Sequence, residues 1–321
     1  MFLFGIYPGG ALGTDSGMSS GPPDDPAKVK AALAALQGDA RQFLVRAYER
    51  FSDAETPSRW PGPSPMGFEQ YLTDGRKLDL VLMFQSARGD IAAYGEWVRA
   101  MIRKHAQSLY AVQVTEEANF INGPDCIDGP WPNVREGLVQ GVKAAKEEAR
   151  RLGIDVKVGF NSTPTFGPSA EFWTGIGAIG GRDFVDALDY VGLDFFPDVF
   201  RPAEDVREAA LTVIETMRQV WLPAAGISDA APIHITEHGW PTGRARSCER
   251  QCEVIETVIR MLFEARERLN IERYTMFDLR DADSTKPEFE NDIFYHFGLM
   301  RDDYTPKPAF ETYRRLIAEL G

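Results

Sequence analysis

The stretch Tyr110-Ala-Val-Gln-Val-Thr-Glu-Glu-Ala-Asn119 is a short β-rich run that ends in polar residues. A polar loop separates it from Val134 to Leu152, where apolar residues recur with helical spacing. A strand, a loop and a helix in this order form a βα unit, and a series of such units builds a parallel sheet covered by helices. This stretch predicts the fold class, provided that the unit repeats.

The same unit recurs along the chain about eight times. We expect strands at Phe2 to Tyr7, Phe43 to Tyr48, Leu78 to Phe84, Tyr110 to Thr115, Val156 to Phe160, Tyr190 to Phe195, Ile233 to Glu237 and Tyr274 to Phe277. We expect helices at Pro26 to Leu36, Ile91 to His105, Val134 to Leu152, Ala203 to Val220, Glu249 to Leu269 and Lys307 to Leu320. This alternation predicts an α/β protein with a single (β/α)8 TIM barrel formed by residues 1–321.

A doubly wound open sheet would show the same alternation, but it usually begins with a glycine-rich turn that leads directly into a helix. In this chain Pro8-Gly9-Gly10 is followed by further glycines and a proline-rich stretch, and the expected helix begins only at Pro26. The sequence therefore favours the closed barrel and gives no sign of a dinucleotide cofactor.

Composition excludes several classes of partner. Acidic residues outnumber basic ones by 48 to 35, so the net charge of −13 would repel a nucleic acid backbone. No apolar run is long enough to span a membrane, and the opening Met1-Phe-Leu-Phe reads as a strand and not as a signal peptide. We expect a monomer with reduced cysteines, located in the cytoplasm unless a secreted precursor has been trimmed. A disulfide from the Cys126 loop stays open as an alternative.

The strand that ends near Glu117 sorts its residues by alternation. Ala111, Gln113, Thr115 and Glu117 share one side, and this small and polar set should face the barrel interior because the helix-facing side should be apolar. The same alternation directs Glu116 elsewhere. Glu117 is therefore the better catalytic candidate.

A second glutamate ends the predicted seventh strand, Pro232-Ile-His-Ile-Thr-Glu-His-Gly-Trp-Pro241. Glu237 shares parity with two isoleucines, so the sequence leaves its direction open. At the ends of strands four and seven, Glu117 and Glu237 would face each other across the barrel mouth, where barrel enzymes carry their active sites. Two carboxyl groups at a separation of roughly 5 Å suit cleavage of a glycosidic bond with retention.

These features resemble the clan A glycoside hydrolases over nearly the whole chain. The resemblance rests mainly on Ile-Thr-Glu237-His-Gly-Trp240, with support from Asp189-Tyr-Val-Gly-Leu-Asp-Phe-Phe196 and from Phe297-Gly-Leu with Thr305-Pro-Lys-Pro-Ala309. It implies that Glu117 is the general acid/base, that Glu237 is the nucleophile, and that the substrate is a β-linked oligo- or polysaccharide. No cofactor is implied.

The resemblance also assigns supporting residues. Arg46 matches an arginine that contacts the nucleophile in that clan, with a buried structural ion pair as the alternative. The clan usually has asparagine directly before the acid/base, where this chain has Glu116, which when ionised cannot donate a hydrogen bond to a sugar. The clan often has a tyrosine on strand six, near Phe195 and Phe196, and a tryptophan on strand eight, near Phe277.

Other polar and aromatic residues follow the predicted strands and suit sugar binding. Those expected to contact sugar hydroxyls are Asn119, Asn161 and Asp278, and those expected to contact sugar rings include Tyr48, Phe120, Trp131, Trp173 and, first among them, Trp240. Packing under long loops, or a solvated charged loop for Asp278, is the alternative.

Three other functions stay open. A barrel that binds a saccharide without cleaving it is the main alternative, because Glu116 departs from the clan at the reaction centre. A transglycosylase would use the same two glutamates. A metal-dependent hydrolase is disfavoured, since the four histidines include no pair on one helix face, and we expect no metal site.

Overall fold

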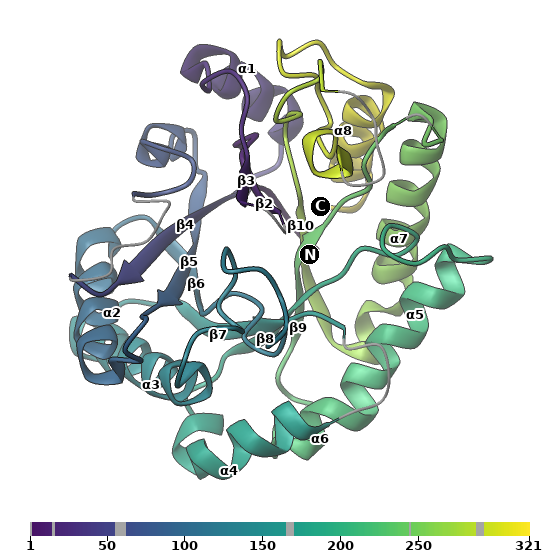
Figure 1. The fold of residues 1–321 in the computed structure, drawn as a ribbon. Coiled ribbons are helices and arrows are strands. Elements are labelled where there is room, and N and C mark those ends of the chain that lie inside the picture. The colour runs from purple at the N-terminus through teal and green to yellow at the C-terminus, as the bar shows by residue number, and fades with distance from the viewer. Residues whose placement is uncertain (1, 15–16, 55–61, 165–169, 244, 287–291) are drawn as a thin grey trace.

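The chain folds into a closed parallel barrel surrounded by helices (Figure 1). The computed structural model describes residues 2–14, 17–54, 62–164, 170–243, 245–286 and 292–321. Around the barrel the strands follow the order β1-β10-β9-β8-β7-β6-β5-β4, so that each neighbours the strand next to it in the chain and β1 closes on both β10 and β4. The predicted (β/α)8 barrel is confirmed.

The barrel strands are β1 (Leu3–Ile6), β4 (Leu44–Ser52), β5 (Lys77–Gln85), β6 (Leu109–Val114), β7 (Lys157–Ser162), β8 (Tyr190–Asp194), β9 (Ile233–His238) and β10 (Ile271–Met276). The helices are α1 (Pro26–Gln37), α2 (Ile91–His105), α3 (Val134–Leu152), α4 (Glu171–Val185), α5 (Val206–Thr216), α6 (Leu222–Ala224), α7 (Cys248–Leu269) and α8 (Pro308–Leu320). Short helical turns lie at η1 (Phe68–Tyr71), η2 (Met217–Trp221) and η3 (Asp292–Tyr295).

Helix α4 and a hairpin in the first long loop are the main elements that were not predicted. Helix α4 contains four glycines, and its sequence Glu-Phe-Trp-Thr-Gly-Ile-Gly-Ala-Ile-Gly-Gly lacks the polar face that marks an amphipathic helix. Packing between α3 and the segment around α6 stabilises it instead. The first long loop contains a small antiparallel hairpin, β2 (Leu12–Thr14) paired with β3 (Gly17–Ser19), where we expected only loop.

Several helices begin where side chains can cap them. Asp25 accepts hydrogen bonds from the backbone N–H groups of Ala27 and Lys28 at 3.0 and 3.3 Å, directly before the proline that starts α1. Asp90 caps α2 and Ser247 caps α7 in the same way. Such caps satisfy N–H groups that have no partner within the helix, so they fix the residue at which each helix starts.

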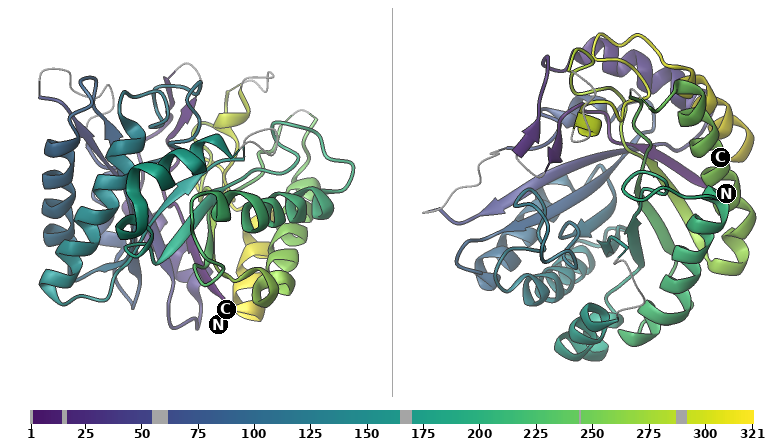
Figure 2. Two further views of the ribbon diagram at one scale, coloured as in Figure 1. Left: turned by 90° about the horizontal axis from the view of Figure 1, so that it is seen from below. Right: turned by 45° about the vertical axis from the view of Figure 1, so that its right-hand side comes forward.

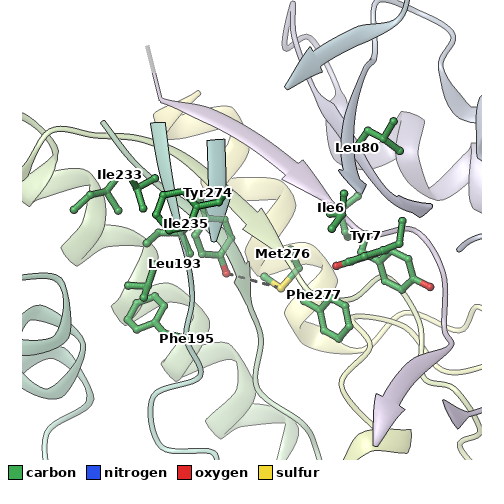
Figure 3. Close-up of a cluster of buried hydrophobic side chains, with 14 of the residues drawn as sticks. Ile6, Tyr7, Leu80, Leu193, Phe195, Ile233, Ile235, Tyr274, Met276 and Phe277 are labelled. Carbon is green, nitrogen blue, oxygen red and sulfur yellow. Dashed lines mark hydrogen bonds between the residues drawn. The ribbon is translucent and has the colours of Figure 1, made fainter. Parts of the chain in front are cut away.

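Apolar side chains fill the space between the strands and the surrounding helices. Figure 3 shows Leu193, Ile233 and Ile235 of β8 and β9 close to Tyr274 of β10, and all four are fully buried. Both chain ends lie together at the end of the barrel where β1 begins (Figure 2), so the carboxyl ends of the strands open at the opposite end. Among the described helices none is both long and apolar enough to cross a membrane, and the three cysteines are free.

A buried ion network lies inside the barrel. Asp79 of β5 accepts hydrogen bonds from Arg46 of β4 at 3.0 Å and from Arg273 of β10 at 2.5 Å, and all three side chains are at most 1 % exposed. Burial alone would raise the pKa of Asp79, but the charges of Arg273 and Arg46 outweigh it and lower that pKa. Asp79 therefore pairs with two buried cations and offsets part of their charge.

We expect Asp79→Asn to destabilise the protein by about 3–5 kcal/mol, because removing one partner of a buried ion pair leaves uncompensated charge. Urea unfolding measures this. Asp155→Asn is the control, since Asp155 is 91 % exposed and its ion pair with Lys157 should contribute little. Equal midpoints for the two variants would contradict the structural role of Asp79.

Candidate active site

A large cavity opens at the carboxyl ends of the barrel strands and contains about 1160 Å³. Its wall includes Glu116 and Glu117, which follow β6, and Glu237, near the end of β9. Its wall also includes Tyr48 of β4 and Asn119. The two predicted catalytic glutamates thus share one cavity.

The turn after β6 directs both Glu116 and Glu117 to this site. Thr115 and Glu117 have positive φ angles of 65° and 46°, which are uncommon for residues other than glycine. These two residues break the alternation of the strand, so the prediction that Glu116 points elsewhere was wrong. Glu116 is 5 % exposed and faces the same polar cluster as Glu237. Strained backbone of this kind persists where surrounding contacts hold it, often at functional sites.

Asp128 holds this turn in place. Its Oδ2 atom accepts hydrogen bonds from the backbone N–H groups of Glu116 and Phe84, both at 2.8 Å, and its own N–H donates to the carbonyl of Glu116 at 2.9 Å. This role could not be predicted, because Asp128 lies in a polar loop outside the motifs considered above.

A β-bulge directs Glu237 into the barrel. Leu193 pairs with Ile235 and the next residue, Asp194, pairs with Glu237, so β9 contains one extra residue, Thr236. An extra residue reverses the side to which the following side chain points. The direction of Glu237, which the sequence left open, is therefore set by this irregularity.

Arg46 and Tyr48 contact Glu237 from β4, which is separated from β9 by β1 and β10 around the barrel. Arg46 Nη2 lies 3.3 Å from Glu237 Oε1, and Tyr48 donates a short hydrogen bond to the same oxygen. Arg46 Nε in turn donates to the Tyr48 hydroxyl at 2.7 Å. The predicted contact between Arg46 and Glu237 is confirmed. The tyrosine that contacts Glu237 thus comes from β4, the second strand of the barrel, while Phe195 and Phe196 follow β8.

Glu116 and Asp194 complete a cluster of carboxylates with Glu237. One oxygen from each lies within 4.8 Å of the others, a spacing that could also hold a cation. The guanidinium of Arg46 already lies 3.4 Å from Glu116, and the side-chain amide of Asn161 donates to Glu116 at 3.2 Å and to Asp194. Sequence reasoning missed Asp194 as a site residue, although it ends a strand.

Burial and the negative charges of neighbouring carboxylates raise the pKa values of Glu117, Glu237 and Asp194. Burial, followed by the negative charges of Glu116 and Glu237, raises the pKa of Glu117 well above its ordinary value. Burial and then Glu116 raise the pKa of Glu237 to about 8, against the opposing effects of Arg46 and Tyr48. Burial, Glu237 and Glu116 also raise the pKa of Asp194. Protonation is therefore more favourable for these three acids than for exposed carboxyl groups.

Asn161 and Asn119 act on the backbone of the site. Asn161 is fully buried, and its Oδ1 accepts the N–H of Glu117 at 2.9 Å. Asn119 lies in the cavity wall, but its amide donates to the carbonyl of Thr163 at 2.7 Å and accepts the N–H of Thr163 at 3.0 Å. Both asparagines position loops around the glutamates.

Four residues predicted to bind sugar lie outside the cavity wall, namely Asn161, Trp131, Trp240 and Asp278, whereas Tyr48, Asn119, Phe120 and Trp173 line it. Trp240 is 3 % exposed and the guanidinium of Arg246 covers its ring at 4.8 Å, so the prediction of a stacking platform was wrong. Asp278 is fully buried, and burial followed by the charge of Asp281 raises its pKa. Because the Asp278 side chain is buried, its predicted contact with sugar hydroxyls was wrong. Phe277 and Phe120 do line the cavity.

Comparison with solved structures shows the same fold in glycoside hydrolases. The GH1 beta-glucosidase from Exiguobacterium antarcticum B7 aligns with a TM-score of 0.61 at 12% identity, over 99% of this chain and 97% of that one. The beta-D-glucuronidase from Dictyoglomus thermophilum aligns with a TM-score of 0.62 at 13% identity, over 100% of this chain and 51% of that one. The GH39 enzyme from Xanthomonas axonopodis pv. citri aligns with a TM-score of 0.58 at 14% identity, over 93% and 64%.

The resemblance to clan A barrels is thus confirmed at the level of the fold. No family model and no curated protein sequence matches this chain. The function of this chain must be argued from its own residues, because a fold hosts many activities.

Proposed function

We propose that the protein is a retaining glycoside hydrolase that cleaves β-glycosidic bonds. The observation that carries the proposal is that Glu117 and Glu237, at the carboxyl ends of two barrel strands, line one cavity, with Arg46 and Tyr48 both contacting Glu237. The glucosidase and glucuronidase folds named above support this class of reaction.

In this mechanism the Glu237 carboxylate attacks the anomeric carbon while the bond to the leaving oxygen breaks and Glu117 donates its proton to that oxygen. Water then attacks the anomeric carbon of the glycosyl ester, Glu117 takes up the proton released by water, and the carboxylate of Glu237 is regenerated. The raised pKa of Glu117 suits its role as acid. Arg46 and Tyr48 favour the ionised form of Glu237 that the attack requires.

The rate should depend on the proton content of the carboxylate cluster. Glu237 must be ionised, and its pKa is raised to about 8, so we expect kcat/KM to rise with pH up to about this value. Glu116→Gln removes a negative charge that raises the pKa of Glu237, so the acid limb should move to lower pH. A pH profile of kcat/KM for both proteins measures this. An acid limb that stays in place or moves to higher pH would contradict the coupling.

A substrate screen tests the proposal. Wild type, Glu117→Gln and Glu237→Gln are compared for reducing-end release from β-linked glucans, mannans, xylans and galactans, together with aryl β-glycosides. Release that disappears in both variants supports the function and identifies the sugar. Reducing-end release that persists in Glu237→Gln would contradict the proposed mechanism.

A saccharide-binding barrel without catalysis is the second candidate. The observation that favours it is Glu116, which adds a carboxylate within 4.8 Å of Glu237 and Asp194. Binding without release, unchanged in Glu237→Gln, would support it. A transglycosylase would use the same residues, and product analysis with added acceptor sugars separates it from a hydrolase.

A further inference from the structure

One side of the cavity is a continuous wall of aromatic rings that starts at the candidate nucleophile. Tyr48 contacts Tyr7, with ring centroids 5.4 Å apart, and Tyr7 stacks on Phe277 at 5.3 Å. Figure 3 shows Tyr7 and Phe277 side by side. Phe277 contacts Phe196 at 6.3 Å, and Phe196 contacts Phe200 at 6.0 Å. All five rings line the cavity.

This wall reaches the surface. Phe294 contacts Phe200 and also Phe297, and both Phe294 and Phe297 line the cavity. Phe200 is 52 % exposed, and Phe120 and Ile121, elsewhere in the cavity wall, are 42 % and 55 % exposed. Large apolar side chains that remain exposed around a binding cavity indicate an apolar ligand.

The wall is poorly suited to a second sugar. Beyond the two tyrosines it consists of phenylalanines, whose side chains offer no hydrogen-bonding atoms. Phe196 meets Phe200, Phe277 and Phe297 at interplanar angles of 80°, so the rings form a corrugated surface and not a flat platform. A sugar pressed into such a surface would bury hydroxyl groups without partners, which is unfavourable.

We infer that the leaving group of the substrate is an apolar aglycone, an alkyl or aryl group linked to a single sugar, and that it lies along this phenylalanine wall. The inference rests on the proposed glycosidase function, since it names the leaving group of that reaction. The cavity of about 1160 Å³ exceeds what one sugar needs, and most of the remaining wall is apolar.

Binding of an alkyl series tests the inference separately from catalysis. Glu237→Gln is titrated calorimetrically with methyl, butyl, hexyl and octyl β-glucosides and β-galactosides below their micelle concentrations. We expect affinity to increase roughly two- to fourfold per added methylene, in line with burial of apolar surface. The gain in affinity per methylene should shrink when Phe200→Ala is added, because Phe200 is the exposed end of the wall. Ile179→Ala is the matched control, because Ile179 is exposed but does not line the cavity.

An affinity that does not depend on chain length, or no binding of the octyl glycosides, would overturn the inference. If Ile179→Ala reduces the gain in affinity per methylene as much as Phe200→Ala does, the inference is also overturned. Hydrolysis by the wild type is measured in parallel. Binding that depends on alkyl chain length, without cleavage of any glycoside, would refute the proposed function but support the apolar site. Cleavage of glycosides whose affinity does not depend on alkyl chain length would support the proposed function but refute the apolar site.

Discussion

Glu237→Gln should lower kcat/KM by roughly 10⁴- to 10⁶-fold, as expected when the nucleophile of a catalytic unit is removed. Glutamine cannot form the glycosyl ester, because its amide oxygen is a far weaker nucleophile than a carboxylate. The hydrogen bonds that Tyr48 and Arg46 make to the Oε1 atom of Glu237 can persist to an amide oxygen, so the fold should survive.

The control for this variant is Glu171→Gln. Glu171 also lines the cavity, but its side chain is 82 % exposed and pairs with Arg135 at the surface, so the rate should hardly change. Thermal unfolding checks that both variants fold. A smaller variant, Glu237→Gly, should regain activity with azide and release a glycosyl azide, because the anion can occupy the space of the missing carboxylate. Full activity of Glu237→Gln without any added anion would contradict the assignment.

Glu117→Gln should lower kcat/KM by about 10²- to 10⁴-fold on glycosides with alkyl leaving groups, since a general acid contributes about that much. The loss should be small for a dinitrophenyl glycoside, whose leaving oxygen needs no proton. The alkaline limb of the pH profile should disappear in the same variant, because the raised pKa of Glu117 sets that limb.

Steady-state kinetics with a series of aryl and alkyl β-glycosides measures this dependence. Thr163→Val is a useful companion, since the Thr163 hydroxyl lowers the pKa of Glu117 by hydrogen bonding and its loss should shift the alkaline limb to higher pH. An equal loss for all leaving groups would argue that Glu117 only positions the substrate.

The barrel could be predicted because its signal is periodic and local. Each strand and most helices show the expected apolar spacing, and β6 begins and ends within a residue of the predicted bounds. Helix α4 could not be predicted, because its glycines and apolar residues form no amphipathic pattern and its stability comes from packing against other elements.

The candidate site could be predicted only where its residues end strands or match motifs. Glu117, Glu237 and Arg46 could be placed by their positions in motifs. The direction of Glu116 could not be predicted, because it depends on two positive φ angles that alternation does not reveal. Asp194 and Asp128 join the site through the register of β8 and through a loop contact. Trp240 shares a motif with Glu237 yet packs away from the cavity, so closeness in sequence does not establish a place in the site.

The central claim is that Glu237 forms a covalent bond with the sugar. The most direct measurement is to incubate the protein with activated 2-deoxy-2-fluoro β-glycosides, which slow the second step, and to locate the adduct by mass spectrometry of peptides. We expect time-dependent inactivation, a mass increase of one fluoroglycosyl group and its attachment to Glu237. Attachment to Glu116 or Asp194, or turnover that inverts the anomeric configuration without any adduct, would contradict the account.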